Sequence, residues 1–460
     1  MKTIVIDDDP TGSQTVHDCP LLLSWDKKTL LEGLEHSSLL FILANTRSLP
    51  PNRAKDRIRK ICKSLSEVFN EKGLSDRDIS IVSRGDSTLR GHGFLEPETI
   101  NEELGPFDAT FHIPAFFEGN RITINGTHFA NGIPVNRTIF AKDKIFGYSN
   151  SFLPSWIEEK SNGLVKANNV VCISIDKLDK ARESKIEMNN LIEFLSSLTF
   201  NQTVIVDAKT SIDLDVFCSA LNALNGKKRF LFRSAASFIN SLTNIKSQTS
   251  DINEISCFKG EVDDFSYKSG MVIVGSHVSL ADNQLAVLLR SEDCIGIELP
   301  VAKFLKILEG SLDQNLLLDF ESILVDKIEG IINKKKTPVF YTSRGELFFE
   351  SNLSRISFGI SLAEFMAVIS SRFIDRLSYI ISKGGITTNT LLKKGLKADF
   401  VNLKGQIMPG LSLVSLPKNL TGFPCDLLTF PGNLGDNDTL LKSWEIMQSY
   451  SDYQNKIRIF

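Results

Sequence analysis

The sequence carries the stretch Ser83-Arg84-Gly85-Asp86-Ser87-Thr88-Leu89-Arg90-Gly91-His92-Gly93 directly after a short apolar run, Ile79–Val82. The run predicts a buried strand, and the stretch predicts the polar turn that ends it. Within the turn, Asp86 lies between two guanidinium groups, with hydroxyls and glycines beside them. Arginine binds carboxylates and phosphates bidentately, and an aspartate can accept a proton or a hydrogen bond from a hydroxyl. The turn therefore suits a small polyhydroxylated anion, although an ordinary loop in which Asp86 pairs with its neighbours is equally consistent with it.

Strand-like and helix-like segments alternate around this turn. The predicted strands of the first half are Thr3–Ile6, Leu39–Leu43, Ile79–Val82, Ala109–Ile113, Val170–Ile175 and Thr203–Val206, and the predicted helices are Asn52–Asn70, Leu178–Leu195 and Ala235–Leu242. This order is typical of an α/β sheet covered by helices. Residues 116–156 interrupt it with Gly, Asn, Phe and Pro, and predict short hairpins around Asn125-Gly126 and Asn131-Gly132. We expect this excursion to be a lid or a subunit contact near the site rather than core.

The alternation restarts after a polar stretch, 244–256, which is the predicted linker. The second half contains predicted strands at Met271–Val274, Val339–Thr342, Tyr379–Ile381 and Leu427–Phe430, and predicted helices at Gln284–Arg290, Leu362–Leu377, Thr388–Leu396 and Thr439–Ser449. We therefore predict two α/β domains in series, residues 1–243 and 257–460.

The composition excludes several classes of protein. The 52 basic and 55 acidic residues among 460 give a net charge of -3, which predicts no nucleic-acid partner. No apolar run is long enough to predict a membrane span, and no secretory signal is expected at the start. The seven cysteines are scattered without a C-x-x-C pair, which argues against a disulfide framework or a structural zinc site. The expected location is the cytoplasm, and the excursion alone makes a homodimer one expectation.

Ligands of open α/β sheets bind beyond the carboxyl ends of the strands, so the residues that follow each predicted strand are candidates. In the first half these are Asp7-Asp8-Asp9-Pro10-Thr11-Gly12, Asn45-Thr46-Arg47-Ser48 and the turn at Arg84–Arg90. They combine carboxylates, hydroxyls and arginines, which suits a substrate that carries a carboxylate and hydroxyls.

The strand ends of the second half carry Gly275-Ser276-His277, Thr342-Ser343-Arg344, a turn at 383–388 and a turn at 431–436. The last two are rich in glycine and are expected to open directly into helices, where backbone N–H groups can approach phosphates. Neither matches the P-loop or the Rossmann fingerprint. Together the two halves predict phosphoryl transfer, with Asp86 as the candidate base, Asp8 or Asp9 next, and Asp436 third.

These residues resemble the four-carbon acid sugar kinase family. The resemblance rests on Asp8-Asp9-x-Thr11-Gly12, on Asn45–Ser48, on Asp86-Ser87-Thr88-Leu89-Arg90-Gly91, and on the Ser276, Gly384–Thr387 and Gly432–Gly435 regions. It covers nearly the whole chain and implies ATP-dependent phosphorylation of threonate, erythronate or 3-oxo-tetronate on the terminal hydroxyl. It also implies an N-terminal acid-sugar-binding domain and a C-terminal nucleotide-binding domain, with the active site in the cleft between them.

The predicted site follows from these arguments. Predicted catalytic residues are Asp86 and Asp8, and predicted substrate-binding residues are Asp8, Asp9, Arg47, Arg84, Gly85, Asp86, Ser87 and Arg90. Predicted ATP-binding residues are Ser276, Gly384, Gly385, Ile386, Thr387, Gly432, Asn433 and Gly435. Mg²⁺ is expected with ATP, and its protein ligands are not predicted.

Two other functions stay open. Asp7-x-Asp9-x-Thr11 after an apolar strand is also what haloacid-dehalogenase-type phosphatases use, with Asp7 as nucleophile and Asp9 as acid/base. A non-catalytic sensor of a sugar acid or nucleotide is the second alternative. The sequence also departs from the family at Pro10 and at Asp436, which leaves the identity of the acid open.

Overall fold

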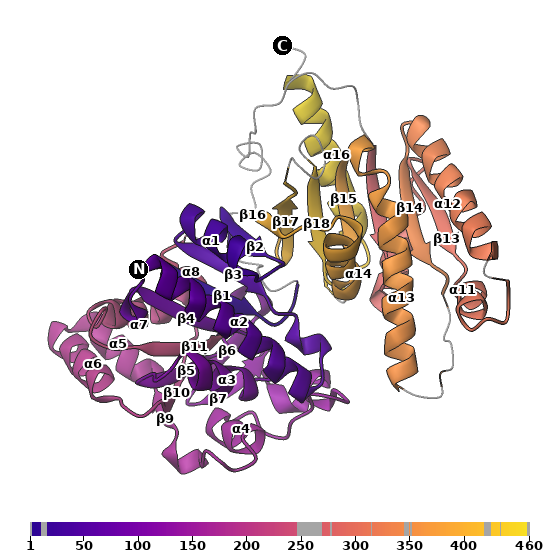
Figure 1. Ribbon diagram of the computed structural model, residues 1–460. Helices are drawn as coiled ribbons and strands as arrows, with labels where there is room; N and C mark the ends of the chain where they lie inside the picture. Colours follow the sequence, from indigo (N-terminus) through magenta and orange to yellow (C-terminus); the bar gives the residue numbers. More distant parts are fainter. Residues whose placement is uncertain are drawn as a thin grey trace. The chain divides into compact units, whose positions relative to one another are not determined.

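The computed structural model describes residues 2–10, 16–245, 269–276, 278–313, 315–344, 349, 352–417, 425–432 and 434–457. The chain divides into two compact units, Met1–Gln248 and Thr249–Phe460. We call them the first unit and the second unit and describe each by itself (Figure 1). The described parts of both units are α/β folds, as predicted.

The first unit is built on a parallel sheet whose strands run in the order β2-β3-β1-β4-β11-β5-β10-β9. The strands are β1 (Lys2–Asp7), β2 (Cys19–Leu22), β3 (Leu39–Leu43), β4 (Ile79–Arg84), β5 (Ala109–Ile113), β9 (Val171–Ile173), β10 (Gln202–Val206) and β11 (Phe230–Ser234). The central strands are apolar runs with both faces buried, as parallel sheets require.

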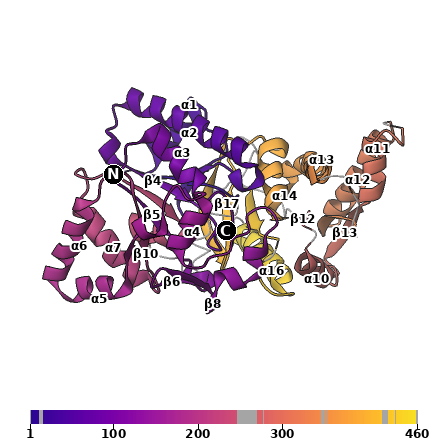
Figure 2. The same ribbon diagram turned by 90° about the horizontal axis from the view of Figure 1, so that it is seen from below.

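Helices cover both faces of this sheet (Figure 2). One face carries α1 (Lys27–His36), α2 (Pro51–Lys72) and α3 (Leu95–Leu104), and the other carries α5 (Ile175–Glu183), α6 (Lys185–Ser197), α7 (Ser211–Asn222) and α8 (Ala236–Thr243). The sequence of α2 explains its length: Pro51 stands at the start, where no N–H is needed, and Gly73 ends the helix at φ 61°. Its buried side chains recur at helical spacing and pack on the sheet.

The excursion at residues 116–156 forms an antiparallel sheet of β6 (Arg121–Ile124), β7 (Thr127–Ala130) and β8 (Ile133–Pro134), followed by α4 (Leu153–Lys160). Both predicted hairpin turns are confirmed, with positive φ at Asn125-Gly126 and Asn131-Gly132. The expectation that the segment lies outside the core is wrong. Val135, Tyr148 and Trp156 are buried in one apolar cluster with Leu89 of the polar turn, because the segment's scattered apolar residues converge there.

The second unit contains a mixed sheet in the order β13-β14-β12-β15-β18-β17-β16. Its strands are β12 (Ser269–Val274), β13 (Cys294–Leu299), β14 (Thr337–Thr342), β15 (Leu377–Lys383), β16 (Phe400–Met408), β17 (Leu411–Ser415) and β18 (Asp426–Phe430). Among these described strands, β17 runs antiparallel to β16 and to β18, and the other neighbouring pairs are parallel.

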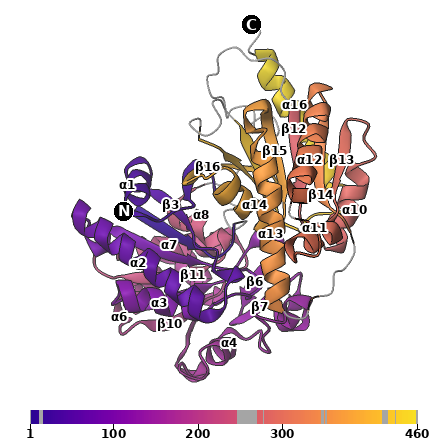
Figure 3. The same ribbon diagram turned by 45° about the vertical axis from the view of Figure 1, so that its right-hand side comes forward.

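Helices cover both faces of the second sheet as well, and Figure 3 shows α13 lying along one of them. That face carries α11 (Val301–Leu308), α12 (Asn315–Asn333), α13 (Asn352–Ser371) and α14 (Gly385–Thr390), while α10 (Ser279–Leu288) and α16 (Thr439–Ile457) pack on the other. Within the described parts of both units, no helix combines the length and the apolarity needed to cross a bilayer.

Several predicted elements have different limits in the structure. The predicted helix Leu178–Leu195 is two helices, because Ser184 caps the start of α6 and breaks the run. Ile175, predicted to end a strand, begins α5, and Leu377, predicted to end a helix, begins β15. The predicted helix Thr388–Leu396 is the end of α14 continued by a π-helical turn.

Candidate functional site

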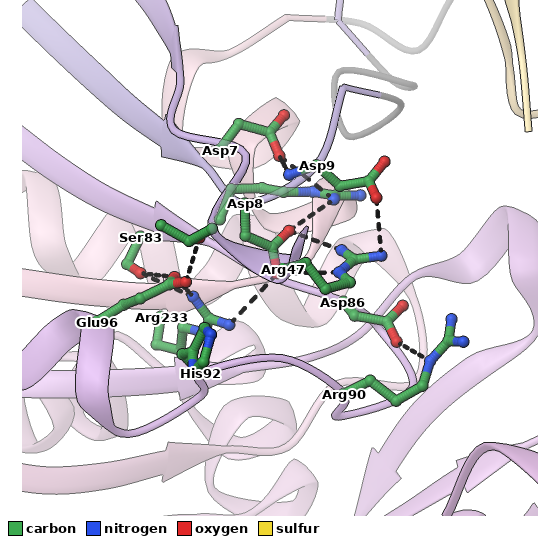
Figure 4. A network of polar contacts seen from close by, with 12 residues as sticks. Asp7, Asp8, Asp9, Arg47, Ser83, Asp86, Arg90, His92, Glu96 and Arg233 are labelled. Carbon is green, nitrogen blue, oxygen red and sulfur yellow. Dashed lines mark hydrogen bonds and ion pairs between the residues drawn. The ribbon is translucent and has the colours of Figure 1, made fainter. Parts of the chain in front are cut away.

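The carboxyl end of β1 and its neighbours form a buried cluster of carboxylates and guanidinium groups (Figure 4). The side chain of Asp8 has no exposed surface, and its Oδ1 lies 2.6 Å from Arg47 Nη2 and 3.6 Å from Arg84 Nη1. Asp8 Oδ2 lies 3.8 Å from Arg233 Nη2, and Asp9 Oδ2 lies 3.4 Å from Arg47 Nη1. Because the strands are parallel, their polar ends meet at one edge of the sheet, as expected from the sequence.

Asp86 lies in the turn that follows β4. Its Oδ2 accepts a hydrogen bond from Arg90 Nε at 2.7 Å and another from Thr88 Oγ1. Burial acts to raise the pKa of Asp86, but the charges of Arg47 and Arg90 and these hydrogen bonds outweigh it and hold the pKa below its usual range. Asp86 is therefore ionised at neutral pH and suited to accepting a hydrogen bond, but it is a weak base.

Asp7, the last residue of β1, has the opposite electrostatics. Its carboxyl is buried, and its Oδ1 accepts a hydrogen bond from the backbone N of Asp9 at 3.2 Å and lies 3.5 Å from Arg84 Nη1. Burial raises the pKa of Asp7 to about 7, because desolvation outweighs the attraction of Arg84, and the Asp8 charge acts in the same direction as burial. Asp7 can therefore hold or release a proton near neutral pH.

Arg233 and Glu96 also belong to the cluster, and the sequence did not predict them. Arg233 Nη1, on β11, lies 2.5 Å from Glu96 Oε2 in the first turn of α3 and donates to Ser83 Oγ at 2.8 Å. Thr46 Oγ1 donates to the other carboxylate oxygen of Glu96 at 2.5 Å. Gly85 allows this packing, because a Cβ there would lie 2.1 Å from Arg233 Nη2. Arg233 follows three apolar residues inside a strand, so no local group of polar residues marked it.

The excursion holds the backbone of the polar turn from its outer side. Tyr148 Oη donates to the carbonyl of Thr88 at 2.6 Å, and His128 Nε2 lies 2.8 Å from the carbonyl oxygen of Ser87. Leu89, which follows Thr88 and precedes Arg90 in the turn, has φ 64°, which is unusual for a residue with a Cβ. A left-handed leucine is costly, so these outside contacts determine the shape of the turn.

A pocket adjoins the cluster within the first unit. Its polar lining includes Asp86, Arg90 and Arg233, and its apolar lining includes Leu153 and Trp156 from α4. His92, the histidine of the turn, faces elsewhere, because its Nε2 lies 2.9 Å from the carbonyl oxygen of Leu49. His92 therefore has a structural hydrogen bond and does not line this pocket.

In the second unit, the turns after β12, β15 and β18 meet. Gly384 adopts φ 120°, and a Cβ on it would lie 3.5 Å from the backbone N of Ser276. A Cβ on Gly432 would lie 2.5 Å from Ser276 Oγ, so side chains beyond glycine do not fit there. Gly385 begins α14, where Ile386 is exposed and Thr387 is buried.

The turn after β18 differs from the expectation that it opens directly into a helix. Gly435 has φ 84°, and α16 begins only at Thr439. Asp436 lies between them and accepts a hydrogen bond from Thr439 Oγ1 at 2.7 Å, and this bond is the main cause that lowers its pKa. Of the residues predicted or used in the resemblance, Thr11, Gly12, His277 and Asn433 lie outside the described residues.

No protein metal site can be assigned among the residues that the structure describes. They contain no group of three or more His, Cys, Asp or Glu side chains placed to hold a metal ion. In the first unit, the carboxylates of Asp8 and Asp9 pair with Arg47, and that of Asp86 pairs with Arg90.

Two family models match the chain. Residues 3–242 match a sugar-binding N-terminal domain, and residues 271–440 match a nucleotide-binding C-terminal domain. The chain is also similar to the D-erythronate kinase of Heliobacterium modesticaldum (strain ATCC 51547 / Ice1), with 26% identity over 149 residues. That alignment covers 31% of this chain and 32% of the relative, so it spans about a third of the relative's length.

Solved structures of similar fold cover nearly the whole chain. A Salmonella typhimurium LT2 protein provisionally described as a tRNA synthase has a TM-score of 0.67 and 16% identity, with 96% of this chain and 98% of that chain covered. Haemophilus influenzae protein HI1011 has a TM-score of 0.63 and 14% identity, with 98% and 99% covered. At these identities the likeness shows the fold alone.

Proposed function

The chain belongs to the four-carbon acid sugar kinase family, and from this premise we propose that it is an ATP-dependent kinase that phosphorylates the terminal hydroxyl of a four-carbon sugar acid. The observation that carries the proposal is the buried arginine–carboxylate cluster at the sheet edge of a sugar-binding domain, in a chain that also has a nucleotide-binding domain. Threonate, erythronate and 3-oxo-tetronate are the proposed acids. The domain limits 1–243 and 257–460, the cytoplasmic location and the homodimer stay predictions.

In the first unit, we propose that Arg47, Arg84 and Arg90 bind the carboxylate and hydroxyls of the acid. Asp86 is ionised and partly surrounded by donors, so its role is to accept a hydrogen bond from the reacting hydroxyl and orient it. Asp7 is the better candidate to hold the released proton, because a base works best when its pKa lies near the operating pH. The ion pairs of Asp8 with Arg47 and Arg84 hold these arginines in place beside Asp7 and Asp86.

In the second unit, the glycine turns suit the phosphates of ATP. Gly384 and Gly432 bring backbone close to Ser276, and a Cβ on Gly432 would fill the space between them. The Nε and Nη2 of Arg344 are buried without a hydrogen-bond partner among the described residues, which fits a site for an anion. ATP would supply the phosphoryl group there, and Mg²⁺ is proposed to arrive bound to its phosphates.

The phosphatase alternative is disfavoured by where its candidate carboxylates lie. It needs magnesium-binding carboxylates beside the nucleophile, which would be Asp7 in the first unit. The carboxylates that would bind its magnesium, Asp436 and Asp438, belong to the other compact unit. A sensor would bind the same ligands as a kinase, so only turnover of ATP distinguishes the sensor alternative from the kinase.

The test is an ADP-release assay with magnesium-ATP against a panel of four-carbon sugar acids. We expect acid-dependent ADP release in the wild type, and a loss of about 10²-fold in kcat for Asp86→Asn, because the reacting hydroxyl would be oriented less well. The matched control is Asp215→Asn, an exposed carboxylate on α7, which should leave the rate unchanged. No ADP release with any acid, while acids and ADP still shift the melting temperature, would indicate a sensor instead.

A further inference from the structure

Lys383 is a buried cation at the edge of the proposed nucleotide site. It is the last residue of β15, directly before Gly384, and its side chain is completely buried. Its Nζ donates to the carbonyl of Pro431 at 3.2 Å and lies 3.8 Å from the ring centroid of Phe430. Among the described residues, no carboxylate forms an ion pair with it. An ammonium buried without a counter-charge is costly, so the folded chain needs a reason to keep it.

Arg344 is a second cation beside the same turns. Its Nη1 donates to the carbonyl of Ser276 at 2.6 Å and lies 3.0 Å from Asp282 Oδ1. Its Nε and Nη2 are buried and have no hydrogen-bond partner among the described residues. Asp282 therefore pairs with Arg344 alone, and the Nε and Nη2 donors of Arg344 are left over for an anion.

The two cations lie next to the backbone that meets at the three turns. Lys383 adjoins Gly384 in sequence and contacts Pro431, the residue before Gly432. Arg344 contacts Ser276, which lies against both glycines. Backbone N–H groups with two adjacent cations form a site of the kind that binds phosphates.

We propose that Lys383 and Arg344 form the cationic centre that binds the polyphosphate of the nucleotide, and that Lys383 takes up a proton from solvent when the polyphosphate binds. The proposal rests on the nucleotide site proposed above. It names two residues that stand at candidate strand ends in the sequence but belong neither to the predicted ATP-binding residues nor to those that carry the family resemblance. Arg344 contributes a permanent charge. Lys383 contributes a charge that depends on the anion.

The electrostatics support proton uptake. Burial and, to a smaller extent, the charge of Arg344 together lower the pKa of Lys383 to about 7. Arg344 is the charged group that faces Lys383 from the end of β14, while Asp282 on α10 and Glu298 on β13 act on Arg344. The described residues at the ends of β12 and β18 that adjoin it, Gly275, Ser276, Phe430 and Pro431, carry no charge. A bound polyphosphate would favour the ammonium form and raise the pKa again.

The test is isothermal titration of the full chain with magnesium-ADP at pH 8, in two buffers that differ in ionisation enthalpy. We expect the wild type to take up nearly one proton per ADP bound. With a pKa of about 7 in the free protein and a raised pKa in the complex, Kd should rise by up to about 50-fold between pH 7 and pH 9. In Lys383→Met the proton uptake and the extra pH dependence should disappear, and ADP should bind more weakly at pH 7.

Controls separate this inference from the proposed function. Lys383→Arg stays charged and should bind ADP at pH 9 more tightly than the wild type, without proton uptake. Lys306→Met, an exposed lysine of the same unit, should behave as the wild type, and His277→Gln should keep the uptake. Uptake that persists in Lys383→Met, or that is lost in His277→Gln instead, overturns this inference alone. A wild type that binds no adenine nucleotide overturns the proposed function and this inference with it.

Discussion

Replacing Asp7 by asparagine should stabilise the first unit at high pH. In the folded chain burial raises the pKa of Asp7 from 3.8 to about 7, so the folded state binds more protons than the unfolded state between these values. The contribution of the protonated carboxyl to the free energy of unfolding is therefore fully present below about pH 4 and is lost as the pH rises through 7. Asparagine is close to isosteric with the neutral carboxyl and can still accept the hydrogen bond from the backbone of Asp9.

The size of the effect follows from the two pKa values. A shift from 3.8 to about 7 is three pKa units, or about 4 kcal/mol in total at 1.36 kcal/mol for each unit. Between pH 5 and pH 8 the same values give a loss of about 2.5 kcal/mol for the wild type, which the variant should not show.

Urea unfolding at pH 5, 6, 7 and 8 measures the difference. Trp25 and Trp156 report on the first unit, and a Trp444→Phe background removes the tryptophan of the second. The free energies of unfolding of Asp7→Asn and its parent should diverge with rising pH, with the variant more stable at pH 8. Parallel pH profiles for the two proteins would refute the assignment of a proton to Asp7, and with it the proposal that Asp7 holds the proton of the reacting hydroxyl.

Three further predictions concern other contacts. Gly85→Ala should displace Arg233, because the added Cβ would lie 2.1 Å from the Nη2 of Arg233. We expect kcat/KM to fall by at least about tenfold while the circular dichroism spectrum stays unchanged, and unchanged kinetics would show that the position of Arg233 is unimportant. Tyr148→Phe removes the hydrogen bond to Thr88, a loss of about 1 kcal/mol that should raise the KM for the acid several-fold while the KM for ATP stays constant; equal changes in both would contradict it. Lys383→Met should raise the free energy of unfolding of the ligand-free chain by up to about 4 kcal/mol at pH 7, because the lowered pKa makes the unfolded state bind more protons than the folded state. This gain should shrink towards pH 10, and a gain that does not depend on pH would indicate an effect of packing instead.

The central strands could be predicted because they are continuous apolar runs. Leu39–Leu43 and Ala109–Ile113 have the predicted limits, since every residue in them is buried. Phe400–Met408 was missed, because buried and half-exposed residues alternate along it and include lysine and asparagine. The break between α5 and α6 depends on the cap at Ser184, a local hydrogen bond that apolar spacing does not report.

The candidate site could be predicted in part for the same reason. Polar residues that follow apolar runs were found, and the structure brings Asp8, Arg47 and Arg84 within ion-pair distance. Arg233 and Glu96 were not predicted, because Arg233 lies within a strand and Glu96 within a helix, each among ordinary neighbours in sequence. Only the ion pair between them in the folded chain marks them as part of the cluster. The sequence suggested Asp86 as the base, and we propose Asp7 as the proton acceptor instead. The reason is that burial raises the pKa of Asp7 while neighbouring arginines lower that of Asp86, and neither effect can be read from the sequence.

The hydrogen bonds that Tyr148 and His128 make to the polar turn have a consequence for how substrate preference could change. The turn keeps its left-handed Leu89 only while a segment some forty to sixty residues away in sequence supports it. If the turn binds the acid as proposed, substitutions in residues 116–156 would therefore change which acid is accepted without changing any residue of the turn itself. Grafting the turn into a relative to change its substrate would therefore also require grafting the supporting residues from 116–156.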